Sequence, residues 1–197
     1  MKITRFVLGL LEANGYIIYQ QESSGCYIID PGGKAELFLQ FMKDHNLACM
    51  GILLTHHHSD HVGAVEKIRK SLDCPVYIHR EDADMYKKPA TTMEDGDIFD
   101  LDDEPIKVVH TPGHTRGSAC FFSEKSKLVF TGDTIFNVDL GRIDLVDGNE
   151  TQMEQSIRNI IAKWSNDVTI YPGHGDACTM KKVRGINREY IDIITRP

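Results

Sequence analysis

The sequence lacks a long apolar run and any excess of positive charge. Its longest apolar stretch, residues 47–54, has eight residues, far short of the ~18 that a membrane-spanning helix needs. Glu12 interrupts the apolar residues near the N-terminus and no small-residue cleavage site follows, so we expect a strand there and not a signal peptide. The formal net charge of -7 argues against a general nucleic-acid binder. We therefore expect neither membrane nor nucleic acid among the partners.

Paired cysteines and nucleophile motifs are also missing. The five cysteines form no C-x-x-C pair, and their odd number is typical of free thiols in a reducing compartment. This favours a cytoplasmic protein. No G-x-S-x-G elbow and no catalytic-cysteine signature is present, which disfavours covalent catalysis. The length of 197 residues suits a single domain over residues 1–197.

Hydrophobic patterning predicts strands followed by helices that alternate with strands. Residues 48–54 are wholly apolar, which predicts a strand buried on both faces. Residues 80–104 show little apolar periodicity, which predicts an irregular excursion with a helical turn. We expect one helix over 151–164, opened by a capping box of Thr151 and Glu154, and a last helix over 179–194. This order implies two sheets with helices outside them.

Histidine is concentrated in the segment Thr55-His56-His57-His58-Ser59-Asp60-His61. It directly follows the apolar strand over 48–54. In an extended segment, residues two apart point the same way, so His56 and His58 can converge on one ion. Asp60 and His61 lie just beyond, at the predicted start of a helix, and can face a second ion. His45, His57 and His79 are interpreted as ordinary core or surface histidines.

Three more candidate ligands each follow a predicted strand: His114, Asp133 and His174. Sites in open α/β folds form at the carboxyl ends of strands. Five imidazoles and two carboxylates exceed the four ligands that close one zinc site, so the set favours two ions. A histidine tag or an adventitious metal-binding tract would lack the aspartates and the three later ligands.

Five short motifs recur in the same order in a known family. The segments IIDPGG, THHHSDH, HTPGHT, TGDT and PGHG span nearly the whole chain and resemble the metallo-β-lactamase superfamily. The resemblance implies an α+β fold, the four-layer αββα sandwich, with two mixed sheets and helices on the outer faces. It also implies two divalent metal ions, zinc in the first place, with iron or manganese as alternatives.

The resemblance also implies a role for each motif residue. The implied ligands are His56, His58 and His114 for one ion, Asp60, His61 and His174 for the other, and Asp133 as the bridge between them. Asp60 and Asp133 are then the expected catalytic carboxylates. Asp30 either orients a ligand from behind or is a plain turn residue.

Within the superfamily the chain is most similar to short glyoxalase II-like proteins, through the opening RFVLGLLEANGYII and the ligand set. That similarity implies a small-molecule thioester substrate and attack by a hydroxide that two metal ions hold. Thioester cleavage needs no dedicated acid, because thiol pKa values lie near ~8.5. The sequence has no counterpart of the C-terminal helical domain that binds glutathione in the long enzymes. Arg142 either anchors a substrate carboxylate or pairs with Asp144.

Two other activities on the same fold stay open at this point. A persulfide dioxygenase would hold a single iron through His56, His114 and Asp133, a two-histidine, one-carboxylate face. Lactone or lactam hydrolysis is the other alternative. Phosphodiester cleavage is disfavoured by the acidic charge, and the oligomeric state stays open.

Overall fold

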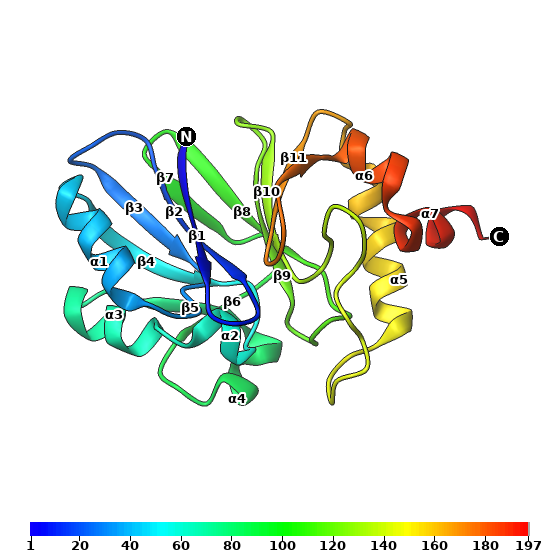
Figure 1. Cartoon of the computed structure of the whole chain (residues 1–197). Helices are drawn as coiled ribbons and strands as arrows, with labels where there is room; N and C mark the ends of the chain where they lie inside the picture. Colours follow the sequence, from blue (N-terminus) through cyan, green and yellow to red (C-terminus); the bar gives the residue numbers. More distant parts are fainter. Residues whose placement is uncertain (197) are drawn as a thin grey trace.

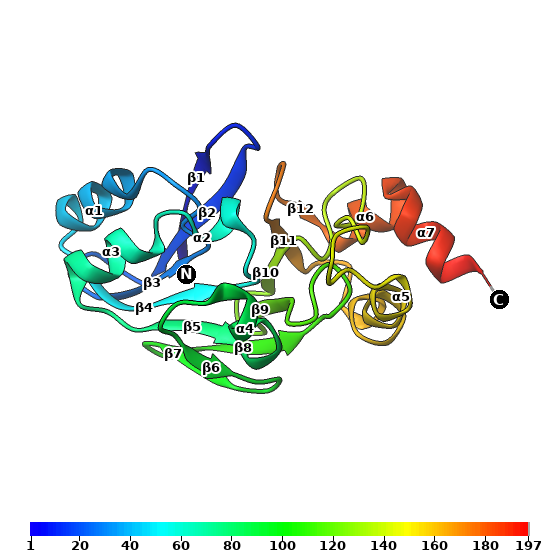
Figure 2. The same cartoon turned by 90° about the horizontal axis from the view of Figure 1, so that it is seen from below.

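Two six-stranded sheets lie face to face, with helices on both outer sides (Figures 1 and 2). The computed structural model describes residues 1–196. The first sheet has the strand order β1-β2-β3-β4-β5-β6 and consists of β1 (Lys2–Leu8), β2 (Ala13–Tyr19), β3 (Gly25–Ile29), β4 (Ala48–Leu54), β5 (Val76–His79) and β6 (Thr91–Met93). The second has the order β12-β11-β10-β9-β8-β7 and consists of β7 (Ile98–Leu101), β8 (Glu104–His110), β9 (Ala119–Ser123), β10 (Leu128–Gly132), β11 (Thr169–Pro172) and β12 (Cys178–Thr179).

The helices cover the two outer faces of the sandwich. In Figure 1, α1 and α3 lie on one side of the molecule and α5, α6 and α7 on the other. Their bounds are α1 (Ala35–Asp44), α2 (Ser59–Val62), α3 (Val65–Leu72), α4 (Ala83–Tyr86), α5 (Glu150–Asn159), α6 (Met180–Ile186) and α7 (Arg188–Thr195). Parallel and antiparallel pairs occur in both sheets. The predicted αββα sandwich with mixed sheets is confirmed.

Three apolar clusters hold the four layers together. The alternation of β4 shows how: Ile52 and Leu54 pack toward α1 and α3, whereas Leu53 packs between the sheets. Successive side chains of a strand point to opposite faces, so a wholly apolar strand suits a sheet that is covered on both sides. Only residues 51–54 follow the prediction for this strand, because Ala48 and Met50 are exposed.

The segment 80–104 is more regular than predicted. It contains a short 3₁₀ helix (Arg80–Asp82), α4, β6 and β7. β6 pairs with β5, and β7 pairs with β8, each at the edge of its sheet. These strands have three and four residues, too few to give a readable alternation, which is why periodicity missed them.

Two predicted helices have different boundaries. The Asn149 side chain, not a Thr151–Glu154 capping box, accepts the Gln152 N–H at the start of α5. α5 ends at Asn159 and a 3₁₀ turn (Ile161–Lys163) follows. The predicted last helix is divided at Asn187, whose side chain caps α7 by accepting the Tyr190 N–H and also donates to the carbonyls of Phe136 and Asp139. The corrected start of α5 and the division of the last helix share one cause: an asparagine side chain bonds backbone groups and so begins a helix there.

All five cysteines are free thiols. Over residues 1–196, none of the helices combines the length and apolar character needed to span a membrane.

The cap of α5 gives a direct test of the corrected boundary. Asn149→Ala should lower the free energy of unfolding by about 1 kcal/mol, because the Gln152 N–H loses its side-chain acceptor. The matched control Thr151→Ala should change it by less than about 0.5 kcal/mol, since Thr151 is exposed. Denaturant unfolding of both variants measures this. If Thr151→Ala lost more unfolding free energy than Asn149→Ala, the result would support the Thr151–Glu154 capping box instead.

Candidate metal centre

The seven side chains predicted as ligands meet at one edge of the sandwich. They are carried by segments that follow the carboxyl ends of β4, β8, β10 and β11: His56 and His58 after β4, Asp60 and His61 in α2, His114 after β8, Asp133 after β10 and His174 after β11. The first of these strands belongs to one sheet and the other three to the second. The centre therefore forms only when both sheets are in place.

The side chains form two groups of three. Within each group the nearest ligand atoms lie within 4.8 Å of one another; the groups are His56, His58 and His114, and Asp60, His61 and His174. Asp133 lies between them. Its Oδ1 is 3.3 Å from His61 Nε2, and its Oδ2 is 3.6 Å from His114 Nε2 and 3.5 Å from His174 Nε2. One carboxylate thus reaches both groups.

Backbone carbonyls orient two of the histidines. The Nδ1 of His114 lies 2.7 Å from the Arg142 carbonyl, and the Nδ1 of His174 lies 2.9 Å from the Leu11 carbonyl. A carbonyl can only accept, so each Nδ1 donates to its carbonyl and each Nε2 is the nitrogen that faces Asp133. Nε2 is thus the atom of each ring that can coordinate an ion once it carries no proton.

Asp30 orients two more histidines. It is buried, and its Oδ2 accepts from His61 Nδ1 at 3.1 Å and from the Thr55 hydroxyl at 2.6 Å. Because that hydroxyl donates to Asp30, it accepts from His56 Nδ1 at 3.0 Å. His56 Nε2 is therefore left as a lone-pair donor, and His61 Nε2 becomes one when an entering metal ion displaces its proton. Such outer hydrogen bonds fix ring orientation in metal sites.

The residues present fit divalent metal ions. His56 Nε2, His61 Nε2 and Asp133 Oδ1 are buried and have no hydrogen-bond partner among the described residues. A buried polar atom without a partner is costly, and most such atoms in proteins are paired. Imidazole nitrogens and carboxylate oxygens are donors that zinc and iron accept. A coordinated ion would satisfy all three atoms.

The two groups differ in charge. Burial and the neighbouring imidazoles hold the pKa of His56 well below its usual 6.5, and burial beside other histidines lowers the pKa of His58 to about 4, so both rings are neutral at neutral pH. At His61, burial alone would lower the pKa, but the carboxylates of Asp133 and Asp30 raise it to about 9. Hydrogen bonds to Asp133 and Asp60 raise the pKa of His174 to about 10. A metal ion entering the second group must displace protons.

Gly173 leaves room for this arrangement. A Cβ at this position would lie 2.1 Å from Asp133 Oδ1 and 2.8 Å from His61 Cε1. Both distances are far inside van der Waals contact, so any side chain would push Asp133 or His61 out of place. The glycine beside His174 is therefore a steric requirement of the centre.

Asp82 ties two of the ligand-bearing segments together, and the sequence analysis missed it. Its buried carboxylate accepts from the Gly117 N–H at 2.6 Å, the Thr115 hydroxyl at 2.9 Å and the His57 ring at 3.0 Å. On its other side, His57 Nε2 lies 3.7 Å from Asp147. His57, interpreted as an ordinary histidine, thus turns away from the ligands and braces them. Asp82 lies in the segment without periodicity, so no pattern marked it.

Asn14 connects the first sheet to the turn that carries His174. Its side-chain amide donates to the carbonyls of Pro172 and Gly175, and its backbone N–H donates to the Gly173 carbonyl. Figure 2 shows the β1–β2 hairpin beside this turn. A buried asparagine within a strand could have signalled such a role, because buried amides need partners.

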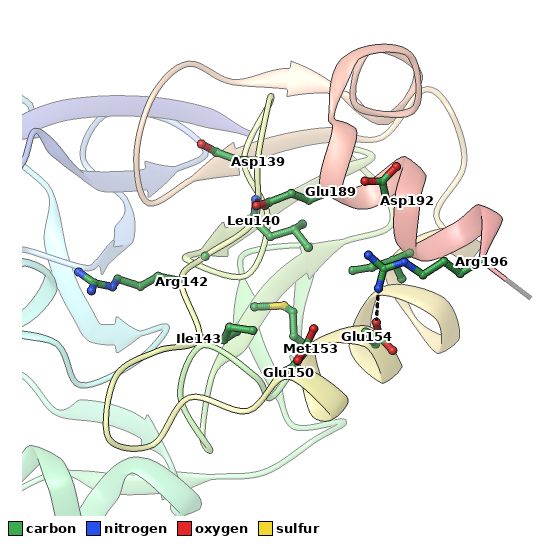
Figure 3. A pocket seen from close by; sticks show the side chains of 12 residues that line it. Asp139, Leu140, Arg142, Ile143, Glu150, Met153, Glu154, Glu189, Asp192 and Arg196 are labelled. Carbon is green, nitrogen blue, oxygen red and sulfur yellow. Dashed lines mark hydrogen bonds and ion pairs between the residues drawn. The ribbon is translucent and has the colours of Figure 1, made fainter.

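Arg142 pairs with Asp144, which is one of the two alternatives that the sequence left open. Its guanidinium donates two hydrogen bonds to the carboxylate, at 2.7 and 2.8 Å. This contact lowers the pKa of Asp144 to about 2. In Figure 3 the Arg142 side chain extends away from α7. Both side chains are largely exposed.

The loop over residues 137–149, which carries Arg142, separates two cavities. One, of about 540 Å³, opens over the metal centre, and its walls include Leu11, Phe136 and Leu145. The other, of about 360 Å³, lies between the loop, α5 and α7 (Figure 3). Its lining includes five carboxylates: Asp139, Glu150, Glu154, Glu189 and Asp192. Within it, Glu154 pairs with Arg196.

Comparison with known proteins now decides the family. The family model of the metallo-beta-lactamase superfamily matches residues 8–174. The chain belongs to this superfamily. The matched region contains all seven candidate ligands, which supports a metal-dependent hydrolase.

Individual members of the superfamily resemble the chain over most of its length. It is 36% identical over 160 residues to a hydroxyacylglutathione hydrolase of Marinomonas sp., covering 81% of this chain and 60% of that protein. The crystal structure of BLEG-1 B3 metallo-beta-lactamase matches with a TM-score of 0.90 and 29% identity, covering 99% of this chain and 100% of that one. TTHA1623 in a di-iron-bound form matches with a TM-score of 0.86 and 30% identity, covering 94% and 99%.

The role of Asp30 can be tested without measuring activity. Asp30→Asn replaces an acceptor of three hydrogen bonds by a group that must also donate, which disturbs His61 directly and His56 through Thr55. We expect zinc affinity to fall roughly ten- to a hundredfold. Titration calorimetry with zinc on the metal-free protein measures it. The control Asp44→Asn, at an exposed carboxylate of α1, should bind zinc as the unaltered chain does.

Proposed function

We propose that the chain is a thioester hydrolase that works with two divalent metal ions, zinc in the first place. The observation that carries the proposal is Asp133, whose two oxygens reach histidines of both groups. When bound, such an ion pair supplies a hydroxide nucleophile at neutral pH and polarises the substrate carbonyl. The similar TTHA1623 structure, which is a di-iron-bound form, supports a two-ion centre.

Each ligand then has a defined place. We assign His56, His58 and His114 to the first ion, Asp60, His61 and His174 to the second, and Asp133 to both. Asp60 and Asp133 act as the catalytic carboxylates, because they would hold the ions beside the attacked carbonyl. Asp30 is not assigned to an ion; it orients His61 by accepting a hydrogen bond from its Nδ1.

A thioester is the substrate best matched to the pocket. Among the described residues that line it, those outside the metal centre are Leu11, Ser59, Phe136, Leu140, Arg142 and Leu145. None of them is an obvious proton donor for a basic leaving group. A thiolate leaves without one, because thiol pKa values lie near ~8.5. Similarity to a hydroxyacylglutathione hydrolase supports the same reaction class.

Lactam hydrolysis is a second candidate, favoured by the likeness to the BLEG-1 enzyme. Amide cleavage expels a far more basic nitrogen than thioester cleavage expels a thiolate. With no proton donor among the pocket residues outside the centre, we expect it to be slow. The persulfide dioxygenase alternative differs in needing one iron.

Metal content tests the two-ion centre. Protein loaded with zinc and then desalted should hold nearly two ions per chain. Asp133→Ala should lose more metal and more activity than His174→Ala, because Asp133 contacts both groups and His174 one. Elemental analysis gives the answer. A single tightly held iron, or equal metal retention in the two variants, would contradict the assignment.

A side-by-side assay tests the reaction. One metal-loaded preparation is given S-lactoylglutathione, a simple thioester, nitrocefin and glutathione persulfide. We expect the thioesters to be hydrolysed, with a high KM for S-lactoylglutathione, and nitrocefin to be cleaved slowly. Rapid nitrocefin turnover with inert thioesters would overturn the proposal in favour of a lactamase. Oxygen consumption on the persulfide alone would favour the dioxygenase.

A further inference from the structure

Exposed apolar side chains concentrate around the mouth of the metal centre. Among the described residues, eleven large apolar side chains are exposed, and five of them belong to two segments that flank the pocket: Leu10 and Leu11 at the tip of the β1–β2 hairpin, and Val138, Leu145 and Val146 in the loop over 137–149. Leu10 is 102% exposed and Val146 is 97% exposed. Exposed apolar residues that gather in this way mark a binding surface.

The same apolar surface continues inward to the reacting centre. Leu11 and Leu145 also line the cavity of about 540 Å³, together with Phe136 and Leu140. The ring of Phe136 stands edge-on to the ring of His174, 5.9 Å between centroids. A molecule that binds in this cavity therefore contacts the candidate metal ligands. Such a position suits a small-molecule substrate and not a partner protein. The volume is within the usual range of small-molecule sites.

Both flanking segments are fixed to the metal centre. The Leu11 carbonyl accepts from His174 at 2.9 Å, and the Arg142 carbonyl accepts from His114 at 2.7 Å. The backbone that carries each apolar wall is thus held at a set distance from the reacting atoms. A substrate chain lying along these walls would be positioned relative to the attacked carbonyl.

The pocket offers few cationic side chains to an anionic substrate. Arg142 is the one cationic residue among the described residues that line it, apart from the histidines, and its guanidinium donates from Nε and Nη2 to the carboxylate of Asp144. The chain as a whole has a net charge of -7. A thioester consists of a carrier thiol and an acyl chain. Carrier thiols such as glutathione are charged, so the acyl chain is the part that can contact an apolar surface.

From these observations we infer that the substrate is a thioester with an extended apolar acyl chain, which lies against Leu11, Phe136, Leu140 and Leu145. The carrier thiol contributes little to recognition. This inference rests on the proposed thioester hydrolysis and adds its substrate class.

An acyl series on a neutral thiol tests the inference. The metal-loaded enzyme is assayed with acetyl, butyryl, hexanoyl and octanoyl thioesters of N-acetylcysteamine. We expect kcat/KM to rise about two- to fourfold for each methylene that reaches the apolar walls. A flat or falling series would overturn the inference. If none of these thioesters is hydrolysed, the proposed function itself fails.

Variants locate the effect. Leu145→Ser should lower the octanoyl-to-acetyl ratio of kcat/KM about tenfold, because it removes one apolar wall. The matched control is Ile98→Ser, an exposed apolar residue of β7 that does not line the pocket, and it should keep the ratio of the unaltered enzyme. Equal ratios in the two variants would contradict the assigned walls.

Two further measurements separate the acyl chain from the carrier. Octanoyl glutathione should have a kcat/KM within about threefold of its N-acetylcysteamine counterpart, whereas a large preference for glutathione without a chain-length effect would overturn the inference. Binding gives a readout besides activity. S-alkyl thioethers of N-acetylcysteamine cannot be hydrolysed, and their Kd should fall as the alkyl chain lengthens.

Discussion

One carboxylate, that of Asp133, lies close to candidate metal ligands from both halves of the chain. Asp133 follows β10, yet its two oxygens approach His61 from the first sheet's half of the chain and His114 and His174 from the second's. Four of the seven candidate ligands are buried, and their polar atoms would be costly to desolvate without an ion. A metal ion bound beside Asp133 would satisfy these polar atoms. Position 173 must be glycine, because a side chain there would displace Asp133 or His61.

The metal centre and the substrate walls share their backbone. Leu11 and Arg142 each give a carbonyl to a ligand histidine, while side chains on the same segments line the pocket. A change in either segment thus affects both the ring orientation of a ligand and the surface that a substrate meets. Outer contacts of this kind usually matter to metal sites nearly as much as the ligands do.

The sequence predicts the layers and the convergence of the candidate ligands at one sheet edge, because both depend on local patterns. His56 and His58 are two apart after an apolar strand, and the alternation of β4 places Leu53 between the sheets. The residues that brace the centre are different. Asp82 and Asn14 act through partners 25 or more residues away, such as His57 for Asp82 and Pro172 for Asn14. No spacing encodes such contacts, and short edge strands such as β6 leave no alternation to read.

Arg142 shows why one residue of a motif can be interpreted in more than one way from the sequence. Arg142 is a cation at the pocket mouth, which from the sequence suits a substrate carboxylate. Asp144, two residues later, accepts two hydrogen bonds from the guanidinium, so a substrate anion that used the same Nε and Nη2 donors would have to displace an intramolecular partner that costs no translational entropy. The Arg142 carbonyl, meanwhile, accepts a hydrogen bond from His114. The contact that Arg142 makes with the centre in the structure is therefore made by its backbone, and the proposed recognition of the substrate depends on the apolar walls.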